Sequence, residues 1–360
     1  MSLKAEWIPM ASSPSQRISP RRSGHTAFTT TTPSSTAFVF GGYIEEDPAK
    51  EGDMPFRDVR NDLWKWKDGA WQLQSPSGDI PGPRLATATA CDNDNNKAYL
   101  FGGWDPQTPG TGGIILDTVH CLDLDSLEWN QLACTLPDGP TSRHVAVTLN
   151  QQNKILLHTF RCIDHVWIFD PNTQEFTQQA TTGTSPGSLG LHTATMLDDT
   201  TLLVWGGATK DGSMTNRAFL LDTETWNWTP IAIMEEECPS ARAGACLGTY
   251  SSTCAILFGG AETTPTGLNP KGDVWALHII PQQEDNNNKN SDNTEGRWEK
   301  LLEEKSSSDD DACPEPRNAA TLTPAVATGS ADDCQEFLMT GGWAPFRQTW
   351  DDVFVLRLSE

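Results

Sequence analysis

The chain has 360 residues, of which 37% are hydrophobic and 20% charged, a composition that favours a folded globular chain over a disordered one. Its formal net charge of −23 argues against binding to a nucleic-acid backbone or to an anionic membrane surface. No apolar run approaches the ~20 residues of a membrane-spanning helix, and the first residues lack the profile of a signal peptide. Nine cysteines without a close pair favour free thiols, so we expect a cytoplasmic location, with the nucleus as the alternative.

A pair of glycines follows an apolar run at several places along the chain. In chain order the pairs are Gly41-Gly42, Gly102-Gly103, Gly206-Gly207, Gly259-Gly260 and Gly341-Gly342. The interval between the second and third pairs is about twice the interval between the third and fourth, which indicates one hidden copy of a repeat. The apolar run Lys154–Leu157 is interpreted as that copy, and His158-Thr159 stands where the glycines are expected.

Each copy carries the same flanking elements. A Ser/Thr/Ala-rich segment precedes the apolar run, and in most copies an arginine opens it: Arg22, Arg84, Arg143, Arg242 and Arg317. An alternating strand follows the run, and then a short strand with a large aromatic: Trp71, Trp129, Phe176, Trp228 and Trp298. Short segments of alternating hydrophobic and polar residues, bounded by Gly, Pro, Asp and Asn, are typical of β-strands. The last copy lacks its aromatic strand, and the segment around Trp7 has the same character.

These repeats resemble the kelch family of β-propellers over essentially the whole chain. The resemblance implies an all-β fold, a six-bladed kelch β-propeller whose ring is closed when the N-terminal strand completes the last blade. We expect a single domain over residues 1–360. The blades are predicted at about 20–75, 82–134, 140–180, 187–232, 239–303 and 314–360 plus 4–11, with a disordered insertion at about 281–294.

The glycine pairs and the strand tryptophans are interpreted as structural. Glycine permits positive φ and close backbone approach where an inner strand turns at the blade edge, and tryptophan is suited to packing between neighbouring blades. The acidic insertion between Tyr43 and Asn61, with Glu45 and Asp53, is predicted to be a solvated loop. It lacks the alternating ligands around a central glycine that a calcium loop needs.

No catalytic or cofactor motif stands out. His158, Cys162 and His165 lie close together, but their spacing matches no zinc pattern, so we interpret them as part of the degenerate third copy. His25 and His192 recur at one position of the repeat, which favours packing on an inner strand. The chain contains no nucleophile elbow, phosphate loop or dinucleotide fingerprint. We therefore expect no catalytic residue, no metal and no cofactor.

In kelch propellers, partners meet the face formed by the loops after the glycine pairs and before the innermost strands. The resemblance therefore implies a central mouth bordered by Tyr43, Trp104, Ala208, Ala261 and Trp343, with Phe160 and Arg161 in the degenerate copy. Just inside the innermost strands lie Gly24, Ala86, Val145, Leu191, Gly244 and Ala319. Large aromatics around one opening are typical of recognition sites. The alternative is that Trp104 and Trp343 fold back under their own loops.

The opening arginines Arg22, Arg84, Arg143, Arg242 and Arg317 have two interpretations. On an acidic protein they could capture a carboxylate of a partner. The family uses this position mostly for structural hydrogen bonds to neighbouring loops. Separately, Ser19, which precedes Pro20 and two arginines, resembles a proline-directed kinase site, and a phosphate there would add a charge of about −1.5 to −2.

The leading prediction is a non-catalytic protein–protein interaction module or scaffold. It is expected to bind another protein or peptide, to bind neither nucleic acid nor membrane, and to be monomeric on its own. One alternative is a substrate receptor of a ubiquitin ligase, because kelch receptors for C-terminal degrons place arginines soon after the glycines of a middle blade. The matching stretch, Ala208–Ser213, has no arginine, and the next one is Arg217. Another alternative is a small-molecule-binding or enzymatic kelch protein.

Overall fold

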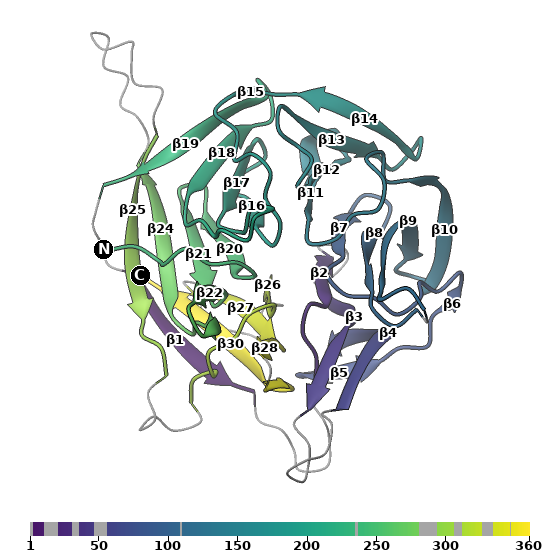
Figure 1. Cartoon of the computed structure of the whole chain (residues 1–360), viewed down its shortest axis with the longest axis horizontal. Helices are drawn as coiled ribbons and strands as arrows, with labels where there is room; N and C mark the ends of the chain where they lie inside the picture. The colour runs from purple at the N-terminus through teal and green to yellow at the C-terminus, as the bar shows by residue number, and fades with distance from the viewer. Residues whose placement is uncertain are drawn as a thin grey trace.

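The computed structural model describes residues 3–10, 21–30, 36–46, 56–108, 110–234, 237–280, 294–305, 312–325, 334–345 and 347–360. Within these ranges the fold is an all-β propeller, with a single turn of 3-10 helix, η1 (Asn150–Gln152). The strands form antiparallel units of four, which Figure 1 shows arranged around one central axis. The expected phosphorylation site Ser19 and the insertion at 281–293 lie outside the described residues.

The units follow one another in chain order. Unit 1 contains β2 (Thr26–Thr30), β3 (Thr36–Glu46), β4 (Phe56–Lys67) and β5 (Ala70–Leu73). Unit 2 contains β7 (Ala88–Asp92), β8 (Lys97–Asp105), β9 (Ile114–Asp123) and β10 (Glu128–Thr135), and the short β6 (Ser77–Gly78) pairs in parallel with β10. Unit 3 contains β11 (Val145–Leu149), β12 (Lys154–His158), β13 (His165–Asp170) and β14 (Glu175–Ala180).

Units 4 and 5 share one continuous sheet. Unit 4 contains β16 (Thr193–Met196), β17 (Thr201–Trp205), β18 (Ala218–Asp222) and β19 (Asn227–Ile233), with β15 (Thr182–Gly183) beside β19. Unit 5 contains β20 (Cys246–Ser251), β21 (Cys254–Phe258), β24 (Val274–Ile280) and β25 (Thr294–Leu302). A separate hairpin of β22 (Ala261–Thr264) and β23 (Gly267–Pro270) projects from unit 5. β19 pairs in parallel with β25, which joins the two units.

Unit 6 combines the two ends of the chain. It contains β26 (Thr321–Pro324), β27 (Cys334–Thr340) and β30 (Val353–Ser359), and its outermost strand is β1 (Lys4–Pro9). β1 runs antiparallel to β30, from Lys4 opposite Ser359 to Pro9 opposite Phe354. Figure 1 shows the two termini side by side as a result. A short hairpin of β28 (Trp343–Ala344) and β29 (Gln348–Thr349) caps this unit.

The hydrophobic core lies between neighbouring units. Each cluster of buried side chains draws on two adjacent units. Trp129 of β10 lies 5.2 Å from Phe40 of β3, and Trp7 of β1 lies 4.9 Å from Phe258 of β21, measured between ring centroids. Aromatic pairs at such distances stabilise the fold by more than the burial of their apolar area alone. The outer-strand tryptophans therefore pack one unit against the next, as the sequence predicts.

A closed cycle of backbone hydrogen bonds joins the units around the axis. Its members, one from each unit, are Gly24, Ala86, Arg143, Leu191, Gly244 and Ala319. The N–H group of each donates to the carbonyl of the member before it, over 2.7 to 2.9 Å, and Gly24 donates to Ala319. All have positive φ, from 51° to 66°, a conformation that costs a residue other than glycine about 1–2 kcal/mol. The hydrogen bonds of the cycle offset this strain. The cycle residues form the bottom of the central mouth, which we call its floor.

The glycine pairs lie where one unit touches the next. A Cβ atom on Gly41 would come within 2.7 Å of the carbonyl oxygen of Arg84 in unit 2, and one on Gly341 within 2.5 Å of that of Arg22. Both glycines also have positive φ. The N–H group of Gly42 donates to the same Arg84 carbonyl over 2.9 Å. Only glycine allows this close approach, which explains why the pair recurs in the sequence.

Candidate functional site

The residue after each glycine pair is held in place by its own unit. Tyr43 exchanges two backbone hydrogen bonds of 2.8 Å with Ser23, which directly precedes the cycle residue Gly24. The same bridge joins Trp104 to Leu85 and Trp343 to Asn318. Backbone geometry therefore places the three predicted aromatics at equivalent positions above the cycle.

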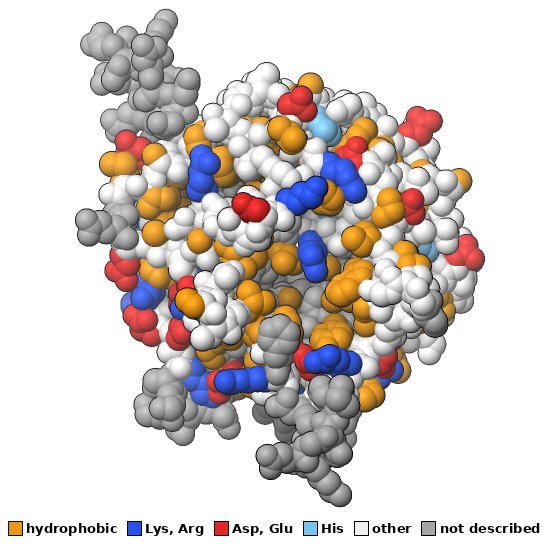
Figure 2. Space-filling view, viewed as in Figure 1, with side chains coloured by type: hydrophobic (Ala, Val, Ile, Leu, Met, Phe, Trp, Pro, Cys, Tyr) orange, Lys and Arg blue, Asp and Glu red, His pale blue; other side chains and the backbone are white. Residues whose placement is uncertain are grey.

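These three aromatics line one cavity of about 600 Å³ at the mouth of the propeller. The cycle residues Gly24, Ala86, Arg143, Leu191 and Ala319 also line it, and Leu268 of the β22–β23 hairpin completes the apolar surface. Figure 2 looks onto this face and shows hydrophobic side chains around a central hollow. Of the residues predicted to bind a partner, the structure thus brings together Tyr43, Trp104, Trp343 and Arg143.

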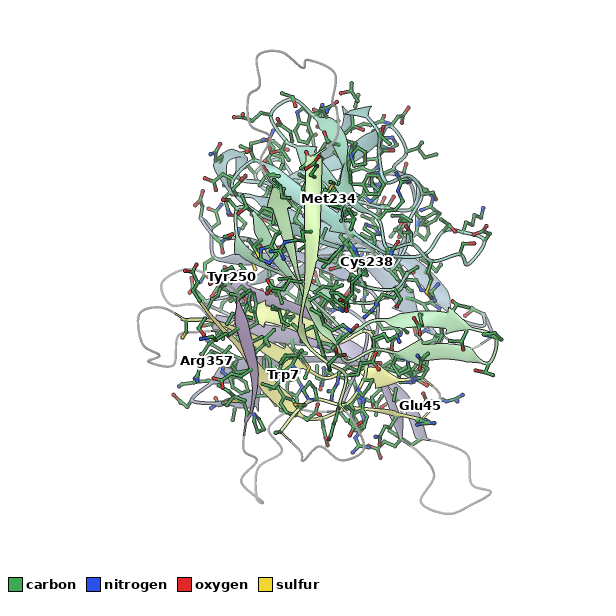
Figure 3. All side chains as sticks on the ribbon, turned by 90° about the vertical axis from the view of Figure 1, so that its left-hand side faces the viewer. Trp7, Glu45, Met234, Cys238, Tyr250 and Arg357 are labelled. Atoms are coloured by element: carbon green, nitrogen blue, oxygen red, sulfur yellow. The ribbon has the colours of Figure 1, made fainter. Side chains whose placement is uncertain are left out.

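A buried carboxylate organises one wall of the cavity. Glu45 accepts hydrogen bonds from Nε of Arg57, over 2.8 Å, and from Nε1 of Trp343, over 2.7 Å. Only 2% of Glu45 is exposed, so the prediction of a solvated loop is wrong for this residue. Burial, followed by the charge of Glu45, raises the pKa of Tyr43 and keeps that hydroxyl protonated. Figure 3 views the ring from its edge, with Glu45 on the side of the mouth and Trp7 on an outer strand.

The two alternatives for Trp104 both hold, for different parts of its ring. Its side chain lines the cavity, and a Cβ atom on Gly113 in its own loop would come within 2.5 Å of its Nε1. Gly113 thus packs closely against the indole ring of Trp104, and the same ring borders the mouth. Trp343, by contrast, is held in place through Glu45 of another unit. Sequence reasoning missed Glu45 because its strand looked like an acidic insertion.

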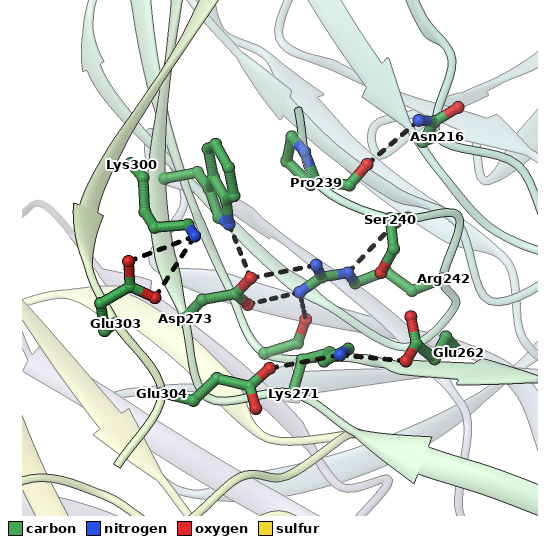
Figure 4. Close-up of polar contacts among 12 residues, drawn as sticks. Asn216, Pro239, Ser240, Arg242, Glu262, Lys271, Asp273, Lys300, Glu303 and Glu304 are labelled. Atoms are coloured by element: carbon green, nitrogen blue, oxygen red, sulfur yellow. Dashed lines mark hydrogen bonds and ion pairs between the residues drawn. The ribbon is translucent and has the colours of Figure 1, made fainter. Parts of the chain in front are cut away.

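Four of the opening arginines are buried and form the structural contacts of the alternative interpretation. Arg22, Arg84, Arg242 and Arg317 are each no more than 5% exposed. Figure 4 shows the arrangement in unit 5, where Arg242 donates to both carboxylate oxygens of Asp273 and, over 3.2 Å, to the carbonyl of Gly259. Their guanidinium groups therefore link the repeat elements together, and the prediction that they contact a partner is not supported.

The same contacts recur in units 1 and 6. Arg22 donates to both oxygens of Asp62 and to the carbonyl of Gly41, and Arg317 donates to both oxygens of Asp352 and to the carbonyl of Gly341. Burial alone would raise the pKa of Asp62, but the charge and hydrogen bonds of Arg22 outweigh it and lower that pKa. In unit 2, Thr118 replaces the carboxylate, and burial lowers the pKa of Arg84 to about 10.

Comparison with known proteins assigns the repeat. The model of the KLHDC2/KLHL20/DRC7 Kelch-repeats domain matches residues 4–201 and 158–359. The chain belongs to the kelch-repeat family. Kelch domain-containing protein 2 of Bos taurus is 33% identical over 285 residues, which cover 72% of this chain and 67% of that protein. The dynein regulatory complex subunit 7 of Chlamydomonas reinhardtii is 31% identical over 127 residues.

Other relatives of this kelch protein are larger. The acyl-CoA-binding domain-containing protein 5 of Arabidopsis thaliana is 25% identical over 169 residues, which cover 45% of this chain and 25% of that protein. The chain spans no more than 30% of the length of this and two similar plant relatives. The solved structure of YjhT has a TM-score of 0.63 at 16% identity and covers 95% of this chain, which shows a shared fold.

The third kelch repeat has a different register from the one predicted. β11 and β12 place Val145 opposite His158, as β16 and β17 place Thr193 opposite Trp205, so Thr159 and not His158 holds the first glycine position. Arg161 then holds the position after the pair, which was predicted for Phe160. In the same way Thr141 holds the position of the opening arginines, since the N–H group of Gly103 donates to its carbonyl.

Arg143 consequently belongs to the cycle, where Val145 was predicted. Its guanidinium carbon lies 5.8 Å from the centroid of the Trp104 ring, inside the mouth. Phe160 and Arg161 do not line the cavity. Arg161 stacks 4.3 Å from the ring of Phe160 and donates to Thr141 Oγ1 over 2.7 Å. The composition of this degenerate repeat gave no signal that would have placed its arginines correctly.

The buried histidines form no metal site. Nδ1 of His158 and Nε2 of His192 share one hydrogen bond of 3.0 Å, while His165 pairs with Asp164 at the surface. Burial lowers the pKa of His144 to about 3 and that of His192 to about 4, so both are neutral at pH 7. Among the described residues, no group of His, Cys, Asp and Glu has the arrangement of a metal site.

Three further features bear on the alternatives. Within the described ranges, none of the helical structure is long and apolar enough to cross a membrane. All nine cysteines are free thiols. The stretch Ala208–Ser213, which degron receptors would furnish with arginines, forms a tight turn in which Thr209 N–H donates to the Ser213 carbonyl over 2.9 Å.

Proposed function

We propose that this kelch propeller is a non-catalytic protein-interaction module that takes a segment of another protein into the mouth cavity. The observation that supports this function is the cavity of about 600 Å³ lined by Tyr43, Trp104 and Trp343. Such a volume accommodates one or two large side chains, and aromatic residues dominate the binding energy of many protein interfaces. The kelch-repeat relatives are consistent with a propeller that serves protein interaction.

The cavity also bears on the enzymatic alternative. An active site needs convergent titratable groups with a free proton donor or acceptor. Here Glu45 is engaged by Arg57 and Trp343, and burial and Glu45 both keep the Tyr43 hydroxyl protonated. This arrangement favours a rigid binding wall over acid–base chemistry.

The test compares cellular partners of the wild-type protein with those of a Trp104→Ala, Trp343→Phe double variant. Leu73→Ala, which removes an apolar side chain that is 59% exposed on β5 away from the mouth, is the matched control. We expect a partner that mass spectrometry identifies with the wild type and the control and not with the double variant, while all three proteins melt within a few degrees of one another. A partner that all three proteins retain would contradict the use of this mouth.

We further propose that the units are the blades of a six-bladed ring closed by β1, with the predicted blade boundaries. The hydrogen-bond cycle, which has one member in each unit, and the pairing of β1 with β30 support this arrangement. Deletion of residues 1–10 should then expose β30 and Phe258 and lower the melting temperature by more than 10 °C. An unchanged melting temperature would contradict closure by this strand.

The free thiols support a proposed location in the cytoplasm, with the nucleus as the alternative, since disulfides are rare in both compartments. Fluorescence microscopy of a tagged chain in its source cell tests this. A signal confined to a secretory compartment would contradict the proposal.

A further inference from the structure

The wall of the mouth is incomplete, and its gap faces two units. Above the floor, every described residue that lines the cavity comes from units 1, 2, 5 or 6. Units 3 and 4 contribute only their cycle residues, Arg143 and Leu191. In unit 3 only the short turn from Thr159 to Asp164 joins β12 to β13. A bound chain can therefore enter or leave the cavity over units 3 and 4, which we call the open side.

The open side carries cations at repeat positions that other units fill with small, aromatic or acidic residues. Arg143 stands in the cycle, where the other members are Gly, Ala or Leu. Arg161 stands at the position of Tyr43 and Trp104. Arg217 directly precedes β18, the position of Asp273 and of the other carboxylates that bind the opening arginines. At these repeat positions units 3 and 4 therefore carry arginines that the other units lack, although the exposed acids Asp164 and Asp211 lie in the same two turns.

These charges are available to a ligand. Arg143, Lys210 and Arg217 are exposed, and none of them forms an ion pair within the described part of the chain. Arg217 lies over the ring of Phe219 at 4.7 Å, which holds its guanidinium at the surface. The acid next to Lys210, Asp211, accepts hydrogen bonds from Thr209 and Ser213. Figure 2 shows Lys and Arg side chains between the central hollow and the upper edge of the molecule.

A cationic patch is unusual on a chain of net charge −23. The net charge repels an acidic ligand at long range, but within a Debye length of about 8–10 Å the local arginines dominate. Both acids that line the cavity are already paired, Glu45 with Arg57 and Asp58 with Arg60. Arg57 also lines the cavity but is paired with Glu45, so Arg143 beside Trp104 is the lining cation that forms no ion pair within the described part of the chain.

We propose that the mouth binds an internal acidic segment of a partner protein. An apolar or aromatic side chain of that segment enters the cavity against Trp104, Tyr43 and Trp343. Carboxylate side chains next to it pair with Arg143 on the floor and with Lys210 and Arg217 on the open side. This assignment rests on the proposed function and names the chemistry of its partner.

The test measures fluorescence anisotropy with labelled peptides on the full chain. The probe is Asp-Asp-Trp-Asp-Asp-Gly, capped by acetyl and amide groups, and Ser-Ser-Trp-Ser-Ser-Gly is its neutral counterpart. We expect the acidic peptide to bind at least tenfold more tightly than the neutral one, with the difference shrinking as salt rises. Arg143→Ala should weaken binding about tenfold, because charge-assisted hydrogen bonds contribute about 1.5–3 kcal/mol. Lys210→Ala and Arg217→Ala should each weaken it about two- to fivefold.

The control is Lys154→Ala, which removes a charge that is 41% exposed at the start of β12 and paired with Asp170. It should leave the affinity unchanged. Equal binding of the acidic and neutral peptides, binding that is insensitive to Arg143, or binding only when the peptide ends in a free carboxylate would each overturn the proposal. So would equal competition by a single-stranded oligonucleotide of the same charge. If a cellular partner depends on Trp104 but not on Arg143, the mouth still binds proteins and only the acidic chemistry is wrong.

Discussion

Units 1, 5 and 6 and units 3 and 4 use the same repeat in opposite ways. In the first group, the opening arginine is buried and tied to a carboxylate of its own unit, as Arg242 is to Asp273. In units 3 and 4, Thr141 and Leu189 hold the arginine position. There the arginines stand elsewhere, and Arg143 faces the mouth.

A repeat that departs from the pattern is therefore not simply a less stable copy of the regular one. A guanidinium that binds a carboxylate and a glycine carbonyl inside its unit has few donors left for a ligand. A guanidinium such as that of Arg143, which leaves the pattern, keeps its donors. The buried arginines of the regular units thus stabilise the fold, whereas Arg143 of an irregular unit keeps exposed donors at the mouth.

The largest expected effect breaks the regular pattern. Asp273→Ala leaves Arg242 buried without its carboxylate and should lower the free energy of unfolding by about 3–5 kcal/mol. Urea denaturation followed by tryptophan fluorescence measures this. Asp94→Ala, which removes an exposed acid, is the control and should change it by less than about 0.5 kcal/mol. Similar values for the two variants would show that the buried ion pair adds nothing.

The next effect separates close approach from backbone strain. Gly341→Ala should cost about 2–5 kcal/mol, because positive φ strains alanine and its Cβ would meet the carbonyl of Arg22. Gly212→Ala has the same strain at φ of 86° but no atom within 4 Å, so it should cost only about 1–2 kcal/mol. Thermal unfolding of both variants gives the difference, and equal losses would exclude the contact between units.

An intermediate effect concerns the histidines of the irregular units. The unfolded chain binds protons at His144 below pH ~6.5, and the folded chain binds them only near its pKa of about 3. Stability is therefore full above pH ~6.5 and falls between these values, by up to about 1.4 kcal/mol per pH unit for this residue. His144→Phe should reduce the slope of stability against pH by that amount. An identical slope in urea titrations from pH 7 to pH 4.5 would argue against a buried neutral imidazole.

The smallest effect sharpens the contrast with Arg242. Arg143→Gly relieves the strain of positive φ and gains freedom in the unfolded state, so the free energy of unfolding should change by less than about 1 kcal/mol. Arg143 then differs from the buried arginines in being dispensable for stability. A loss of several kcal/mol in chemical denaturation would mean that its side chain serves the fold.

Much of this molecule could be predicted from periodicity. The glycine pairs, apolar runs and aromatic strands recur because each unit meets its neighbours in the same way, so one physical constraint appears many times in the sequence. Tyr43, Trp104 and Trp343 could be placed at the mouth because each follows a glycine pair. Arg143 was predicted to bind a partner only as one of the opening arginines, and its position in the cycle could not be predicted because its copy lacks the glycines. Glu45 was missed because it lies in an acidic insertion.

Local sequence properties, namely hydrophobic alternation and the positions of the glycines, were enough to determine the all-β propeller class and the repeat. Which arginines are buried, and which cation faces the cavity, became clear only from the tertiary structure. Burial and ion pairing depend on neighbours that are distant in the chain, such as Arg317 and Asp352. A shift of two residues in the segment before β11, which no local pattern marks, moves Arg143 from the position of the buried arginines to the floor of the mouth.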